Sequence, residues 1–190
     1  VPQALPSGWY ANSKDGARPV EDVLIQNLIP HIDANYRTIA SPKARGIEGM
    51  SMGGYGALRL GLKYPELFGV ISAVAPSITE KLSDEPEIRT GETFFGDQDY
   101  FEATGPWGIV KSNTAAILKA NPAIRILGGS LDGLEPVIKK FNQLLNELGI
   151  RYEFIEVEGV GHNYTDILGK SPVEPYLFWE IEFRKVISST

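Results

Sequence analysis

The pentapeptide Gly49-Met50-Ser51-Met52-Gly53 is the part of the sequence whose residue types and spacing most directly indicate chemistry. A serine between two glycines at this spacing is typical of a sharp strand-to-helix turn that exposes a nucleophilic hydroxyl group. We expect glycine at both flanking positions because side chains there would collide with the turn. The pattern predicts Ser51 as a nucleophile and the N–H of Met52 as one donor to an oxyanion. A glycine-rich turn without chemistry is the alternative.

A serine nucleophile requires a general base, and the sequence has two histidines. His162 stands in the segment GVGHN, directly after the last β-prone run of the chain. Loops that follow strands are where open α/β sheets place ligand chemistry, so His162 is the predicted base. His31 lies within a helical pattern, and we expect it on a helix surface. An ordinary loop histidine is the alternative interpretation of His162.

The base in turn requires a carboxylate that orients it, and Asp132 in the turn GGSLDG is the predicted residue. It follows a β-prone run closely, and the resulting chain order of serine, aspartate and histidine is that of α/β-hydrolases. A helix N-cap is the alternative role for Asp132. Asp166 and Glu158 are the acidic residues nearest to His162 in sequence, and we expect Asp166 on the surface.

Patterns for cofactors and metals do not fit. Ser51 stands where a dinucleotide-binding pattern needs glycine, and Tyr55 stands where a phosphate-binding loop needs lysine. Asp97 and Asp99 resemble the start of a calcium loop, but Phe101 occupies the third ligand position. The sequence therefore implies no cofactor and no metal site.

The substrate-binding candidates rest on weaker signals. We name Trp107, Tyr55 and Leu134 as residues that could line a pocket for an acyl or aryl group. Ordinary packing beneath a long loop is the alternative for Trp107 and the aromatic residues near it.

Alternating strand and helix patterns predict an α/β fold with a mostly parallel sheet and helices on both faces. A helical period covers residues 21–37, 133–148 and 173–187, and residues 77–113 read as an excursion over the sheet with short helices at most. The β-prone runs cover residues 45–50, 69–75, 123–129 and 152–158.

Composition and charge exclude several classes of protein. The 190 residues are 43% hydrophobic and carry a net charge of −6, which is typical of one globular domain. Lysine and arginine are scattered, so we expect no nucleic-acid partner. No apolar stretch reaches the roughly 20 residues of a membrane helix, so we expect a soluble protein without a membrane partner. Cysteine is absent, which excludes disulfides and leaves the compartment open. No signal peptide is visible.

The segment GMSMGGYGALRLGLKYPELFGVISAVAPSI resembles the nucleophile turn, helix and next strand of the putative-esterase family of α/β-hydrolases. That family includes esterase D, tributyrin-type esterases, feruloyl esterases and mycolyltransferases. WYANS, EDVLIQNLIPHIDANYRT, GGSLDG and LGIRYEFIEVEGVGHNY extend the resemblance over nearly the whole chain. It implies that Ser51, Asp132 and His162 form a catalytic triad acting on a small ester, such as a short-chain acyl or feruloyl-type ester.

The sequence departs from the family at its start. Members carry several strands before the WYANS segment, and one of them ends in a turn that supplies the second oxyanion donor; nothing here matches them. We therefore expect residues 1–190 to form a single catalytic domain that is the C-terminal portion of the full fold. An N-terminal fragment or a second subunit is expected to complete the sheet. A thioesterase or acyltransferase, a non-catalytic binding module and an inactive fragment are the alternative functions.

Overall fold

The computed structural model describes residue 2 and residues 7–187, and its centre is a parallel four-stranded sheet. Each strand lies within the corresponding predicted run, and the order across the sheet is β1-β2-β3-β4. The α/β class expected from the alternating pattern is confirmed. The strands are β1 (Gly46–Met50), β2 (Val70–Val74), β3 (Ala123–Gly129) and β4 (Glu153–Val157).

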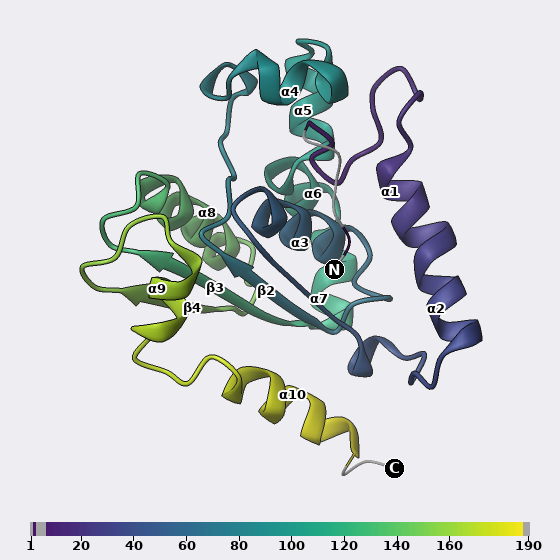
Figure 1. The fold of residues 1–190 in the computed structure, drawn as a ribbon, viewed down its shortest axis with the longest axis vertical. Helices are drawn as coiled ribbons and strands as arrows, with labels where there is room; N and C mark the ends of the chain where they lie inside the picture. The colour runs from purple at the N-terminus through teal and green to yellow at the C-terminus, as the bar shows by residue number, and fades with distance from the viewer. Residues whose placement is uncertain (1, 3–6, 188–190) are drawn as a thin grey trace.

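Helices connect the strands and cover the sheet (Figure 1). The connection between β2 and β3 is the predicted excursion, and part of it lies above the sheet in Figure 1. The described helices are α1 (Val20–Asp22), the π-helical η1 (Val23–Leu28), α2 (Ile29–Asn35), the 3₁₀ turn η2 (Pro42–Ala44), α3 (Met52–Lys63), the 3₁₀ turn η3 (Leu82–Asp84), α4 (Glu87–Phe94), α5 (Gln98–Thr104), α6 (Pro106–Ser112), α7 (Thr114–Ala120), α8 (Glu135–Glu147), α9 (Tyr164–Gly169) and α10 (Leu177–Ile187).

The main core lies between the sheet and helices α3, α6 and α8. Every residue of β2 is buried, as expected for a central strand covered on both faces. The ring of Trp107 on α6 packs edge-on against Phe141 of α8, with 5.0 Å between the ring centres. Leu58 of α3 is completely buried in the same cluster. These contacts fix α3, the helix that follows the predicted nucleophile.

A buried carboxylate joins the first helix to α3. Glu21 is 3% exposed and accepts hydrogen bonds from Arg59, Lys63 and Tyr64. Burial acts to raise the pKa of Glu21, but the charge of Arg59 and these hydrogen bonds outweigh it, so the pKa is lowered. A buried carboxylate with several charged and polar partners keeps its charge, and it ties the N-terminal helical stretch to the core.

β1 is an edge strand of the described sheet, since β2 is its one neighbour there. An apolar groove of about 540 Å³ runs along its free side. Leu24 and Leu28 of η1 form one wall, and Ile47 and Met50 of β1 form the other. The apolar stripe of the first helix is therefore only partly buried. Covering of this edge by an N-terminal fragment or a second subunit stays a prediction.

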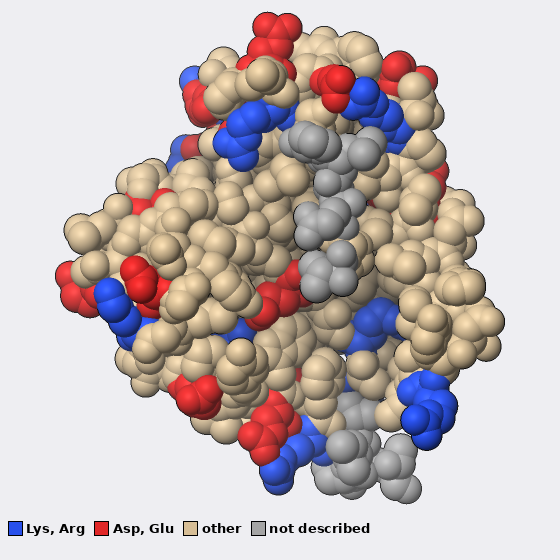
Figure 2. Space-filling model, viewed as in Figure 1, with Lys and Arg blue, Asp and Glu red and all other residues tan. Residues whose placement is uncertain are grey.

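Charged side chains are dispersed over the face shown in Figure 2, and uncharged residues cover most of its centre. This dispersal agrees with the scattered lysines and arginines of the sequence. Among the described residues, none of the helices combines the length and the apolar character that crossing a bilayer requires.

Candidate active site

The three residues predicted to do chemistry all follow strands of the sheet. Ser51 directly follows β1, Asp132 lies three residues beyond β3, and His162 lies in the loop after β4. Because all four strands are parallel, their carboxyl ends meet at one edge of the sheet. The fold therefore places these side chains at the edge where α/β sheets carry their ligand sites.

Ser51 has a strained backbone. Its φ of 55° and ψ of −116° lie outside the regions that residues with a side chain usually adopt. The surrounding structure holds this conformation: the N–H of Ser51 donates to Val74 O at 2.9 Å, and its C=O accepts from Tyr55 N at 2.9 Å and Ser77 N at 3.0 Å. Strain of this kind costs about 1–3 kcal/mol and persists where neighbouring contacts enforce it, as is common at active sites.

The two glycines around Ser51 differ in their steric roles. A Cβ atom at Gly49 would lie 2.2 Å from the carbonyl oxygen of Gly53, so only glycine fits there. A Cβ atom at Gly53 would meet Tyr10 Oη at 3.8 Å, which is an ordinary contact. The expectation that both positions require glycine is therefore correct for Gly49 and wrong for Gly53. The reason is that Gly53 already belongs to α3, where a side chain points away from the turn.

Gly49→Ala is expected to destabilise the protein by about 1–3 kcal/mol, the usual cost of forcing extra atoms into a packed site. Gly53→Ala is the matched control and is expected to be neutral or to stabilise α3 by up to about 1 kcal/mol, because alanine favours helices over glycine. Urea unfolding of the two variants measures both effects. Equal destabilisation by the two substitutions would contradict this assignment of the turn.

Asp132 and His162 form a hydrogen-bonded pair, with 2.7 Å between Asp132 Oδ2 and His162 Nδ1. The side chain of Asp132 is 2% exposed, whereas that of His162 is 38% exposed. The second carboxylate oxygen, Oδ1, accepts from Leu134 N at 3.0 Å. Asp132 is not the N-cap of α8, because the helix begins at Glu135 and Leu134 is its cap residue. One carboxylate oxygen of Asp132 holds the turn before the helix, and the other binds the histidine. A carboxylate on Nδ1 leaves Nε2 as the ring nitrogen that can accept a proton.

The loops that carry this pair are bound to each other. Leu131 N donates to Val160 O at 2.9 Å, and Gly159 N donates to Ser130 Oγ at 2.9 Å. A Cβ atom at Gly129 would lie 2.2 Å from Val160 O, so a residue with a side chain there would push the loops apart. Gly129 is given no such role in the sequence analysis above. The two successive glycines at the end of its strand are the signal that could have revealed it.

Ser51 and His162 are not joined by a hydrogen bond in the described part of the chain, whereas Asp132 and His162 are. Catalytic hydrogen bonds are often long or misaligned without substrate and shorten in the complex. Met52 is the first residue of α3, so its N–H has no acceptor within the helix. Ser51 and Met52 also line the apolar groove beside β1.

The residues named for substrate binding lie in or against the core. Tyr55 is 1% exposed and packs edge-on against Trp9, and Trp107 donates its indole N–H to Ile78 O at 2.7 Å. Leu134 is partly buried against the same core cluster. For Trp107 the structure agrees with the packing interpretation, because α6 turns its ring inward. Tyr55 of α3, for which no such alternative was given, is buried in the same core cluster.

The rival residues lie as expected. His31 is exposed on α2, where Asn35 is its neighbour. Asp166 is exposed in the first turn of α9, and Glu158 is exposed after β4. Asp132 remains the buried carboxylate that binds His162.

Comparison with known sequences places the chain among esterases. The model of the putative-esterase family matches residues 5–127, a range that includes Ser51 and ends before Asp132. An esterase of Mycobacterium tuberculosis is 43% identical over 67 residues, which are 34% of this chain and 15% of that protein. An endo-1,4-beta-xylanase/feruloyl esterase of Xylanibacter ruminicola is 31% identical over 120 residues, or 62% of this chain and 15% of that protein. The chain thus spans 15% of the length of these curated relatives.

Solved structures share the fold over almost the whole chain. A fluorophosphonate-binding serine hydrolase of Staphylococcus aureus has a TM-score of 0.71 and 19% identity, and the match covers 98% of this chain and 68% of that one. An S-formylglutathione hydrolase of Agrobacterium tumefaciens has a TM-score of 0.69 and 20% identity, with 96% and 66% covered. A ferulic acid esterase has a TM-score of 0.66 and 21% identity, with 94% and 64% covered. Because the family model also matches more than half of the sequence, the chain belongs to the putative-esterase family.

Proposed function

We propose that the protein hydrolyses carboxylic esters through an acyl-enzyme, with Ser51 as nucleophile, His162 as general base and Asp132 as the carboxylate that orients the base. The observation that carries this proposal is the 2.7 Å hydrogen bond from the histidine to a buried carboxylate, at the sheet edge that also presents a strained serine. Membership of an esterase family supports the reaction class.

The chemistry follows from the position of each group. Ser51 Oγ attacks the ester carbonyl while His162 Nε2 accepts its proton and then returns it to the leaving alcohol. Water repeats the sequence on the acyl-enzyme and releases the acid. Asp132 stabilises the imidazolium that forms in each step. The N–H of Met52, at the positive end of α3, stabilises the oxyanion, and a second donor from a segment beyond the described residues stays a prediction.

The substrate we propose is a short-chain acyl or aryl ester of the feruloyl type. Its support is the feruloyl esterase among the relatives and the ferulic acid esterase among the similar structures. Thioester hydrolysis is the second candidate because an S-formylglutathione hydrolase shares the fold. Comparison of p-nitrophenyl acetate, methyl ferulate and an acyl thioester as substrates separates these possibilities by their kcat/KM.

His162→Ala in the full-length protein is expected to abolish hydrolysis of these substrates and labelling of Ser51 by a fluorophosphonate probe, since both need the serine proton removed. His31→Ala is the matched control and should change neither, because His31 is exposed on α2. Peptide mass spectrometry locates the label. A wild-type protein that is folded and takes no label would instead indicate a non-catalytic module, and equal losses in the two variants would indicate a different site.

A further inference from the structure

A row of polar residues crosses the sheet at one register level. Glu48 of β1 pairs with Ser72 of β2, Ser72 pairs with Arg125 of β3, and Arg125 pairs with Glu153 of β4. Arg125 is 1% exposed, and its guanidinium donates to Ser72 Oγ at 3.0 Å and to Pro175 O at 2.7 Å. Charged residues are almost never so deeply buried unless they are paired.

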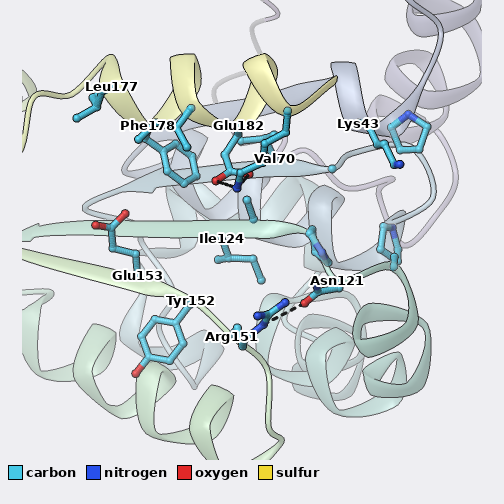
Figure 3. A pocket seen from close by; sticks show the side chains of 18 of the residues that line it. Lys43, Val70, Asn121, Ile124, Arg151, Tyr152, Glu153, Leu177, Phe178 and Glu182 are labelled. Carbon is cyan, nitrogen blue, oxygen red and sulfur yellow. Dashed lines mark hydrogen bonds and ion pairs between the residues drawn. The ribbon is translucent and has the colours of Figure 1, made fainter. Parts of the chain in front are cut away.

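Glu48 supplies the negative charge that Arg125 needs. One of its carboxylate oxygens, Oε2, lies 3.2 Å from Arg125 Nη2. Burial lowers the pKa of Arg125, and the charges of Glu48 and Glu153 raise it by less, so the pKa stays below its usual value. The carboxylates thus offset part of the free energy that burial of the cation costs. The ring of Phe178, which points from α10 toward the sheet in Figure 3, lies 4.4 Å from the guanidinium carbon and covers it.

The same carboxylate reaches the segment that carries the histidine. Tyr164 Oη donates to Glu48 Oε1 at 3.3 Å, and Trp179 Nε1 of α10 donates to Oε2 at 3.3 Å. Tyr164 lies two residues beyond His162, and Glu48 lies three residues before Ser51. The hydrogen bond between Glu48 and Tyr164 therefore links β1, which precedes Ser51, to the segment that contains His162. In the sheet, β2 and β3 lie between β1 and β4, the strand before that segment.

We infer that Glu48 is a positioning residue, which sets the distance between Ser51 and His162 by holding Tyr164 and Arg125 at once. This inference rests on the proposed function. β1 has β2 as its one neighbour in the described sheet, so strand pairing constrains it from one side. The Glu48 carboxylate adds a second constraint. It acts on the strand that precedes Ser51 and on the segment that contains His162. Glu48 touches neither serine nor histidine and acts through the backbone of each.

The test compares Glu48→Gln and Tyr164→Phe with the control Glu153→Gln in the full-length protein. Glu153 has the same side chain, occupies the same polar row beside Arg125 and is exposed on β4 as Glu48 is on β1. Within the described residues it makes no hydrogen bond to Tyr164 or Arg125, whereas Glu48 bonds to both. Each of the first two variants is expected to lower kcat about tenfold to 100-fold, the range that a misplacement near 1 Å produces, with KM changed less than about twofold. The double variant should lose no more than the more severe single variant, because both act on the same Glu48–Tyr164 contact: glutamine removes the charge of its acceptor and phenylalanine removes its donor. Glu153→Gln should keep the wild-type kcat.

Circular dichroism at the assay temperature checks that each variant is folded, and Tyr164→Phe serves if Glu48→Gln unfolds. A second measurement is the titration of Tyr164 by NMR with ¹³C-labelled tyrosine. Burial and the charge of Glu48 raise the pKa of Tyr164, so Glu48→Gln should lower it and Glu153→Gln should not. The inference would be overturned if kcat fell only in proportion to the fraction of protein that is folded. It would also be overturned if the loss in the double variant equalled the product of the two single losses.

The failure of this inference differs from failure of the proposed function. If wild-type hydrolysis depends on Ser51 while Glu48→Gln and Tyr164→Phe keep the wild-type kcat, the positioning role is wrong and the esterase assignment stands. If the folded wild-type protein hydrolyses no ester and takes no fluorophosphonate label, both are wrong.

Discussion

Ser51→Ala is expected to lower kcat/KM for ester hydrolysis by about three orders of magnitude or more, since in the proposed mechanism the acyl-enzyme forms on Ser51 Oγ. The fold should survive, because the contacts that hold the turn are made by the backbone N–H and C=O of Ser51. Alanine has a Cβ atom in the same place as serine, so the backbone strain at position 51 should be the same in the variant. Initial rates on a p-nitrophenyl ester and thermal unfolding measure the two properties.

Ser112→Ala is the control for this prediction. Ser112 is exposed at the end of α6 and donates to Ile109 O within its own helix. The Ser112→Ala variant loses one hydroxyl oxygen, as Ser51→Ala does, and it should hydrolyse the ester at the wild-type rate. Retention of more than a few per cent of wild-type turnover by Ser51→Ala would show that the nucleophile is another residue.

Asp132→Asn is expected to lower kcat about 10⁴-fold while leaving the loop geometry in place. The amide can still accept from Leu134 N, but its NH₂ group facing His162 Nδ1 would require that nitrogen to be an acceptor. The proton would then sit on Nε2, the nitrogen that the proposed mechanism requires to accept the serine proton. Steady-state kinetics over a range of substrate concentrations gives kcat and KM separately.

Asp166→Asn is the matched control because Asp166 is close to His162 in sequence but exposed on α9. It should keep kcat within about twofold, as expected for a surface substitution remote from the reacting groups. Equal effects at the two positions would mean that the hydrogen bond between Asp132 and His162 does not orient the base.

Sequence patterns were sufficient for the four strands and the longest helices, but they predicted neither α7 nor the π-helical stretch η1. Four β-prone runs matched four strands. The central strand β2 is buried along its whole length, which explains its apolar run, whereas β4 alternates between exposed and less exposed residues. Ser51, Asp132 and His162 could be chosen because each follows such a run. This placement needs no knowledge of how the side chains pack.

The parts that sequence could not supply depend on register and on close approach between segments. That Glu48, Ser72 and Arg125 lie side by side follows from strand pairing, although charges within apolar runs were a visible signal. The different tolerance at Gly49 and Gly53 depends on where α3 begins. Tyr55 is a weakly supported pocket candidate from sequence, and the turn of α3 directs its ring into the core.

The single neighbour of β1 has a consequence for how activity is lost. In the described sheet β1 and β4 are both edge strands, but the loops that carry Asp132 and His162 are also bound to each other, whereas Ser51 follows β1. Regions of a protein open with different free energies, and we expect β1 to open more easily than the segments whose loops are bound to each other. Fluctuations that displace β1 remove the serine while the remaining strands stay intact. Inactivation in mild denaturant would then be a local and reversible event that precedes global unfolding. The denaturant concentration that halves the rate of hydrolysis would be lower than the concentration at which half of the protein unfolds.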